Sequence, residues 1–171
     1  MTPVEIQIVP APASSVTRIR ARYSETDQMG VVYHANYLIW MEVARVDYCR
    51  TAGFRYRDLE GEYGVLLAVT EVGCRYLSPA RYDDEIEIVT SLNRANHRAV
   101  TFGYELRSVP AEGDGESRRI ATGHTSHIFL NRDMRPTTLP LQFRAMFGIP
   151  VAVEQALSPA DPNRKSAPFR V

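Results

Sequence analysis

The residues best suited to chemistry lie within one stretch, residues 22–41, which reads RYSETDQMGVVYHANYLIWM. A strand pattern leads into this stretch, a loop is predicted at residues 25–30, and a long helical pattern follows. Asp27 therefore precedes a helix start, where backbone N–H groups have no partners and the helix dipole is positive. An aspartate is an anion near neutral pH, and an anion beside free donors suggests a catalytic site. Aspartate is also a favoured turn and capping residue, so a structural role is the alternative.

Two blocks of the sequence resemble a known enzyme family. The first block runs from Tyr23 through Asp27 into Gly-Val-Val-Tyr-His-Ala-Asn-Tyr at residues 30–37, and a long helix follows it. The second block is Tyr-Leu-Ser-Pro-Ala-Arg-Tyr-Asp-Asp at residues 76–84. Over roughly residues 16–147, the chain resembles the hot-dog-fold acyl-CoA thioesterases of the 4-hydroxybenzoyl-CoA thioesterase family. Within that family it most resembles the branch that includes the bacterial Tol-Pal-associated enzymes.

The resemblance implies a reaction and the residues that perform it. The reaction is hydrolysis of an acyl-CoA thioester to a carboxylic acid and free coenzyme A, without a metal or redox cofactor. Asp27 would act as nucleophile or general base, and the backbone N–H of His34 would polarise the thioester carbonyl. The His34 side chain could orient Asp27 or carry a proton, because imidazole titrates near neutral pH. Tyr23 matches another position that the Tol-associated branch uses, and the helix residue Glu42 is the reserve candidate for the catalytic acid.

Coenzyme A carries phosphates, so the substrate also needs cationic partners. The turn Asn96-His97-Arg98 aligns with a basic turn that contacts nucleotide phosphates in the benzoyl-specific members of the family. Only Arg98 is firmly cationic there, so Arg75 and Arg81 are further candidates because they lie near predicted strand ends. Each of these arginines could instead be an ordinary solvated side chain.

One strand and one long helix must hold these groups in place. The segment before the loop alternates from Val16 onward, which predicts a half-buried strand with Tyr23 on its inner face. The helix is predicted to begin near residues 34–36 and to run to about Ala52. Its apolar residues recur at spacings of three and four, as in a helix that packs on a sheet; they are Tyr37, Trp40, Met41, Ala44 and Tyr48. The first two could line an acyl pocket or simply pack in a core.

The rest of the domain is predicted to consist mainly of strands. Alternating and apolar segments predict strands at residues 65–76, 84–92, 98–109 and 118–131. A polar connection is expected at residues 55–63, a short hairpin turn at 94–97, and a final short helix on Leu141, Ala145 and Met146. One helix followed by antiparallel strands gives an α+β fold. The resemblance specifies a hot-dog fold, in which a five-stranded antiparallel sheet wraps around one long helix.

Size and composition predict a single domain with short extensions. The chain has 171 residues, of which 44% are hydrophobic and 23% charged. These values suit a domain at residues 16–149, with a flexible arm at 1–15 and a mobile tail at 150–171. The net charge is zero, so no overall field attracts nucleic acid or an anionic membrane. The sequence has no apolar run of about 18 residues and no secretory signal, so we expect a cytoplasmic protein.

A lone sheet of this kind leaves one edge unpaired and one side of the helix uncovered, which promotes association. Members of the resembled family pair two sheets edge to edge and place each active site at the subunit boundary. A homodimer or a dimer-of-dimers tetramer is therefore expected, with a small acyl-CoA molecule as the substrate.

Other functions stay open on the sequence alone. A hot-dog hydratase or dehydratase would use a histidine with a carboxylate on the helix, and Asp27 in the loop disfavours it. A non-catalytic acyl-CoA-binding module, or a partner of a larger assembly, would keep the pocket without turnover. A metal site is not expected, because His124 and His127 are three apart on a strand and point to opposite faces. The sequence has no Gly-x-Ser-x-Gly elbow, which disfavours a serine-triad thioesterase.

Overall fold

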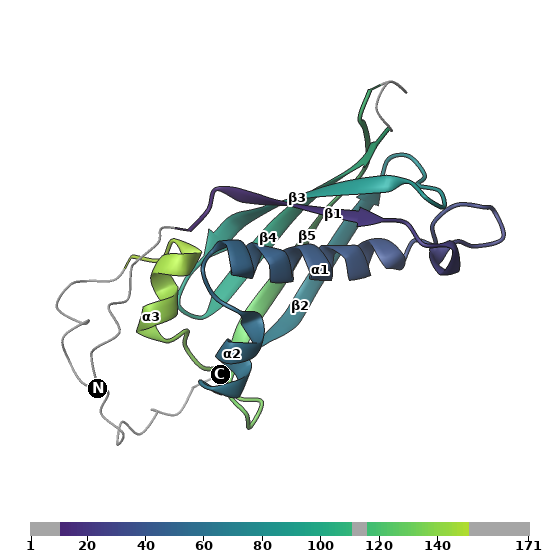
Figure 1. The fold of residues 1–171 in the computed structure, drawn as a ribbon. Coiled ribbons are helices and arrows are strands. Elements are labelled where there is room, and N and C mark those ends of the chain that lie inside the picture. The colour runs from purple at the N-terminus through teal and green to yellow at the C-terminus, as the bar shows by residue number, and fades with distance from the viewer. Residues whose placement is uncertain (1–10, 111–115, 151–171) are drawn as a thin grey trace, which may run out of the picture.

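The computed structural model describes residues 11–110 and 116–150, which form one sheet with a long helix lying across it (Figure 1). The sheet has five antiparallel strands in the order β1-β3-β4-β5-β2. The strands are β1 (Ser14–Arg20), β2 (Leu66–Tyr76), β3 (Glu85–Ala95), β4 (Ala99–Val109) and β5 (Arg118–Leu130), and the long helix is α1 (Asn36–Thr51). This arrangement confirms the predicted α+β hot-dog fold. Most of the predicted arm and tail lies outside the described residues, so those domain boundaries stay predictions.

The apolar stripe of α1 packs against the inner face of the sheet. Its members are each 3% exposed or less, which confirms the predicted helix face; they are Tyr37, Trp40, Met41, Ala44 and Tyr48. The sheet contributes fully buried side chains from alternate positions, Ile86 and Ile88 on β3 and Phe102 and Leu106 on β4. Burying one large apolar side chain stabilises the fold by about 1.5–3 kcal/mol. This contact therefore fixes α1, and with it the segment that leads into α1.

The chain between β1 and α1 differs from the prediction. β1 ends at Arg20, and the chain then forms a short 3-10 helix, η1 (Tyr23–Glu25). Tyr23 is therefore not on a strand, and the alternation of the preceding residues does not continue to it. The break follows from pairing, because β1 runs beside β3 only as far as the Arg20–Glu85 pair.

Two later boundaries also differ. The polar connection predicted at residues 55–63 contains a helix, α2 (Tyr56–Gly61), whose one buried residue is Leu59. So short a helix, with a single buried side chain, shows too little periodicity to be recognised in a sequence. β3 continues to Ala95, so the hairpin turn lies at residues 96–98.

Two short helices cover the end of the core where α1 stops (Figure 1). They are α3 (Leu141–Arg144) and η2 (Ala145–Phe147), which confirms the predicted final helix. Phe143 and Phe147 pack on Phe54, with ring centroids 5.5 and 5.4 Å away. Within the described residues, the helices are all too short or too polar to cross a membrane.

Candidate active site

Asp27 opens a tight turn between η1 and α1. Two backbone hydrogen bonds close this turn, from Asp27 N to Val31 O and from Gly30 N to Asp27 O, both 2.9 Å long. Gly30 has a φ of +70°, which residues with a side chain disfavour. The Asp27 Oδ1 atom accepts a 2.8 Å hydrogen bond from the Met29 N–H. Aspartate makes this kind of bond when it has a structural role in a turn. The Oδ2 atom accepts no hydrogen bond from the described residues, so it is available to a ligand.

Asp27 lines a hollow at the amino end of α1, called here the amino-end hollow. It encloses about 320 Å³, and its walls come from the Asp27 turn, the start of α1 and the end of β2. Its lining residues are Asp27, Met29, Val31, Val32, His34, Tyr37, Tyr76, Leu77, Ser78 and Pro79. The structure thus brings together three predicted site residues, Asp27, His34 and Tyr37. The prediction placed Asp27 directly before the helix, but it lies nine residues before Asn36, the first residue of α1. The turn at Asp27 folds the chain so that Asp27 still lies near the amino end of α1.

The amino end of α1 presents unpaired backbone donors. The N-cap residue, Ala35, supplies no side-chain cap to the helix. Across the part of the chain that the structure describes, the N–H groups of His34 and Ala35 donate to no acceptor. Donors at the positive end of a helix dipole can stabilise negative charge on a carbonyl oxygen. Asp27 and His34, which carries one of these donors, therefore line the same hollow.

Tyr76 is a site residue that the sequence reasoning missed. Its hydroxyl donates a 3.0 Å hydrogen bond to the His34 carbonyl, and its ring lies edge-on to Tyr37 with centroids 5.1 Å apart. Burial raises the pKa of Tyr76 to about 12, so the hydroxyl keeps its proton at neutral pH. The bond ties the end of β2 to the residue that carries a free donor. The one available signal was the position of Tyr76 at the head of the second family block.

Three other candidates do not line the amino-end hollow. Tyr23 is 77% exposed and lies edge-on to Tyr82, so the inward orientation predicted for it is wrong. Trp40 is buried, and its indole Nε1 donates a 3.2 Å hydrogen bond to Glu25, so it packs in the core. Glu42, the reserve candidate for the acid, is exposed on α1.

The predicted phosphate-binding turn, Asn96-His97-Arg98, lies at the other end of the sheet. The Asn96 Oδ1 atom accepts a 2.8 Å hydrogen bond from the Arg98 N–H, and the His97 carbonyl accepts one of 2.9 Å from Leu139 N–H. These bonds hold the turn beside the segment that leads into α3. Within one chain, the turn does not meet the Asp27 turn, so it is not part of the amino-end hollow.

Two other arginines lie beside the amino-end hollow. The Arg81 guanidinium is 3.5 Å from the Gly30 carbonyl of the Asp27 turn. The Arg118 guanidinium donates a 3.0 Å hydrogen bond to the carbonyl of Pro79, which lines the hollow. Both side chains are exposed, so they put positive charge within reach of a ligand in the hollow.

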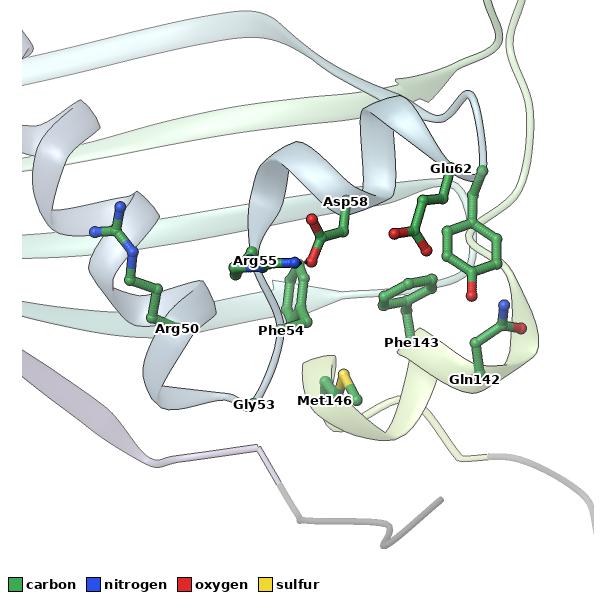
Figure 2. Close-up of a pocket in the computed structure, with 10 residues that line it drawn as sticks. Arg50, Gly53, Phe54, Arg55, Asp58, Glu62, Gln142, Phe143 and Met146 are labelled. Carbon is green, nitrogen blue, oxygen red and sulfur yellow. Dashed lines mark hydrogen bonds and ion pairs between the residues drawn. The ribbon is translucent and has the colours of Figure 1, made fainter. Parts of the chain in front are cut away.

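A second and larger hollow, called here the carboxyl-end hollow, lies where α1 ends (Figure 2). It encloses about 470 Å³ and includes the apolar side chains of Phe54, Phe143 and Met146. Its charged members are Arg50, Arg55, Asp58 and Glu62. Figure 2 shows Arg55 directed at Asp58, and Arg55 Nε lies 2.6 Å from the Asp58 carboxylate. The free backbone groups at this end of a helix are carbonyls, which cannot stabilise a developing oxyanion.

His124 and His127 point to opposite faces of β5, as predicted from their spacing of three residues. The His124 ring lies 3.1 Å from a carboxylate oxygen of Glu71 on the exposed side of β5. His127 is 1% exposed, and its Nε2 atom lies 2.8 Å from the Thr125 hydroxyl in the core. Among the residues that the structure describes, no cluster of three or more histidines, cysteines and acids could hold a metal ion.

Comparison with known proteins identifies the family of this chain. The family model of the thioesterase-like superfamily matches residues 21–161. The protein YneP of Bacillus subtilis (strain 168) is 39% identical over 133 residues, which cover 78% of this chain and 89% of that protein. The acyl-CoA thioesterase YbgC of Haemophilus influenzae is 33% identical over 129 residues, which cover 75% of this chain and 90% of that protein.

Solved structures show the same fold. The DHNA-CoA thioesterase from Staphylococcus aureus is 35% identical with a TM-score of 0.67, over 74% of this chain and 80% of that chain. The 4-hydroxybenzoyl CoA thioesterase from Pseudomonas sp. strain CBS-3 is 18% identical with a TM-score of 0.72, over 79% and 99% of the two chains. The second likeness is one of fold.

Proposed function

This chain belongs to the thioesterase-like superfamily and is a thioesterase, and we propose that its substrates are acyl-CoA thioesters. The observation that carries the proposal is the amino-end hollow, which Asp27 and His34 both line and where the His34 N–H has no acceptor among the described residues. A thioester carbonyl bound between them would have a nucleophile or base on one side and a hydrogen-bond donor on the other. Thioesters are already reactive acyl donors, so this small set of groups is sufficient.

In the proposed mechanism Asp27 takes one of two roles. As a nucleophile, its carboxylate attacks the carbonyl carbon, coenzyme A leaves as a thiolate that takes up a proton, and water cleaves the mixed anhydride. As a general base, it removes a proton from the water that attacks the carbonyl carbon. In either route one water is consumed: its oxygen enters the new acid or, when water attacks the Asp27 carbonyl of the anhydride, enters Asp27 in exchange for an oxygen given to the acid. Its proton replaces the one taken up by the thiol, so the proposed reaction balances without a metal or redox cofactor. The His34 imidazole would orient Asp27 or carry the proton.

Arginines beside the hollow are the proposed partners of the coenzyme A phosphates. Arg81 and Arg118 have the advantage of position, because both contact segments that form the hollow. Arginine binds phosphate with two parallel N–H groups. The turn at residues 96–98 keeps a phosphate-binding role only if a second subunit brings it to this hollow.

We propose that the working form is a homodimer or a dimer of dimers. β2 is an edge strand of the sheet, and its Val69 and Val72 side chains are exposed. Ile39 and Val43 likewise expose apolar surface on α1. An uncovered edge beside exposed apolar groups favours association. Size-exclusion chromatography with light scattering is expected to give two or four chains, and a monomer at micromolar concentration would contradict this.

The proposal also covers the branch and the compartment. We place the chain nearest to the Tol-Pal-associated branch, on the strength of the sequence blocks at residues 23–37 and 76–84. We place its activity in the cytoplasm, and the free thiols of Cys49 and Cys74 fit that reducing compartment.

A thiol-release assay tests the proposal. Purified protein is mixed with a panel of acyl-CoAs and a thiol reagent, and turnover is expected for at least one acyl group. Asp27→Ala is expected to lower kcat by about a hundredfold or more, whereas Glu42→Ala keeps it. Tight binding of acyl-CoA without turnover would instead establish a non-catalytic binding module.

Labelled water tests whether Asp27 acts as the nucleophile. In a single turnover in oxygen-18 water, label in the Asp27 carboxylate would establish the mixed anhydride. Label confined to the released acid would be the result either of general-base catalysis or of attack by water on the acyl carbon of the anhydride.

A further inference from the structure

Glu25 is a buried carboxylate two residues before Asp27, and the sequence pattern assigns it no role. It is the last residue of η1 and only 4% exposed. Its side chain accepts hydrogen bonds from the Arg22 N–H at 2.8 Å, the Arg22 guanidinium at 2.7 Å and the Trp40 indole at 3.2 Å. A carboxylate is costly to bury unless it is paired and hydrogen-bonded. These donors account for its place inside the fold.

The backbone of Glu25 makes a second set of contacts. Its carbonyl accepts a 2.9 Å hydrogen bond from the Tyr33 N–H and a 2.8 Å bond from the Asn36 side-chain amide. Asn36 is the first residue of α1, and Trp40 lies about one turn further on. Glu25 therefore joins the chain before the Asp27 turn, the chain after it and the start of α1. We call this set of contacts the Glu25 clamp.

We propose that Glu25 is a positioning residue that fixes Asp27 relative to the amino end of α1. The inference rests on the proposed function, because it concerns the same site. Asp27 lies two residues after Glu25. His34 lies one residue after Tyr33, whose N–H is bonded to the Glu25 carbonyl, so both site residues are next to the clamp in the chain. Glu25 does not line the amino-end hollow, so it acts through these contacts and not on the substrate.

The negative charge of Glu25 is part of the clamp. Burial alone would raise the pKa of this carboxyl, but the hydrogen bonds from Arg22 and Trp40 and the charge of Arg22 bring it below its usual value. An ionised carboxylate offers only acceptors, and here three N–H groups meet it. A glutamine in its place would turn an NH₂ group toward one of these donors. The loop would then shift, and a displacement of about 1 Å can cost about a hundredfold in rate.

The test compares Glu25→Gln with a matched variant, Glu105→Gln. Glu105 also pairs with arginines, Arg107 and Arg119, but it lies on β4 away from the hollow. The measurements are kcat, KM and the pH profile of kcat for an acyl-CoA that the wild type hydrolyses, each corrected for the folded fraction. Glu25→Gln is expected to lower kcat by about 10- to 100-fold, with KM within about threefold and the shape of the pH profile unchanged. Glu105→Gln is expected to stay within about twofold in kcat and KM.

A second variant keeps the test decisive if Glu25→Gln does not fold. Trp40→Phe removes one N–H donor but leaves an aromatic ring in the core, and it is expected to lower kcat by about 3- to 10-fold. An unchanged kcat in whichever of these variants fold would overturn the inference. So would the loss of one limb of the pH profile in Glu25→Gln, because Glu25 would then transfer a proton itself. Failure of the proposed function is distinct, since Asp27→Ala would then turn over as fast as wild type.

Discussion

The two ends of α1 carry hollows of different chemistry. The carboxyl-end hollow is the larger, about 470 Å³ against 320 Å³, and it contains two acids, Asp58 and Glu62, together with arginines. The amino-end hollow contains one acid, Asp27, among mainly apolar walls and beside unpaired amides. Size and the number of acids would therefore select the carboxyl end, not the end proposed for the active site. The direction of α1 distinguishes them, because the helix dipole is positive at the amino end, where the His34 N–H has no acceptor among the described residues, and negative at the carboxyl end.

The two hollows are also held in different ways. Aromatic packing among Phe54, Phe143 and Phe147 forms the carboxyl end. Directed hydrogen bonds from Tyr76 and to Glu25 hold the amino end. Apolar packing tolerates small shifts, whereas a hydrogen bond weakens steeply with angle and distance. A reaction that needs atoms held in fixed positions is better supported by the second kind of wall.

Filling each hollow with an indole is expected to give the largest contrast between the two ends. Val31→Trp places a bulky ring in the amino-end hollow and is expected to lower kcat/KM by about a hundredfold, because the thioester no longer reaches Asp27. Met146→Trp fills the carboxyl-end hollow and is expected to stay within about twofold. The kcat/KM of both variants is measured with the panel of acyl-CoAs. The reverse result would move the active site to the carboxyl end.

Removing one polar side chain from each hollow sharpens the same comparison. His34→Ala is expected to lower kcat by about 10- to 50-fold, because the imidazole is lost while the backbone N–H remains. The matched variant is Gln142→Ala at the carboxyl-end hollow, for which no change is expected. Steady-state kinetics at saturating substrate measures the difference. If His34→Ala kept full kcat, the role of His34 would be confined to its backbone.

The amino-end hollow was partly predictable because six of its ten lining residues lie close together in sequence, between Asp27 and Tyr37. Residues 22–41 contain the Asp27 turn, the free donors and the first turns of α1, and the spacing of apolar residues revealed the face of that helix. Tyr76 and the side-chain role of Glu25 escaped prediction because they depend on contacts that alternation cannot show. The Tyr76 hydroxyl meets a carbonyl 42 positions away. The alternation before Tyr23 led to a wrong prediction that Tyr23 lies on the strand, because alternation does not show that pairing with β3 stops at Arg20.

The carboxyl-end hollow could not be predicted. It is assembled from residues 50–63 and 142–146, which share no pattern and meet only in the folded chain. α2, which forms one wall, is six residues long and buries a single side chain. The position of the turn at residues 96–98 could not be predicted either, because it depends on contacts between segments that are far apart in the sequence. Its sequence shows a basic residue but not the end of the sheet on which it lies.

Acid is expected to weaken the two ends in different pH windows. His127 packs on Phe102, which contacts Phe147 near the carboxyl end, and burial, aided by the charge of Arg45, lowers its pKa to about 4. An unfolded histidine titrates near about 6.5, so the unfolded chain binds the proton more readily and stability falls from about pH 6.5 toward 4. The expected loss is about 3 kcal/mol, because each pKa unit is worth about 1.4 kcal/mol. It is measured by urea unfolding, and His127→Gln is expected to make stability depend less on pH in this window.

The Glu25 clamp responds to stronger acid. The pKa of this carboxyl lies below its unfolded value, so its stabilising effect is complete above about pH 4.3 and is lost as the pH falls through the folded value. Glu25→Gln is therefore expected to make the free energy of unfolding less dependent on pH only below about pH 4.3. Flattening near pH 6 in Glu25→Gln would contradict the assignment of the two windows.

The smallest effect is expected from the ion pair at the carboxyl end. Asp58→Asn removes the charge that pairs with Arg55, and exposed pairs of this kind stabilise proteins by at most about 1 kcal/mol. We expect a small fall in the melting temperature that disappears at high salt, because salt screens the wild-type pair. The hydrolysis rate should stay within about twofold, since the carbonyls at this end of α1 offer nothing to a developing negative charge. A tenfold fall in kcat would contradict this, because an acid at the wrong end of the helix would then be taking part in the reaction.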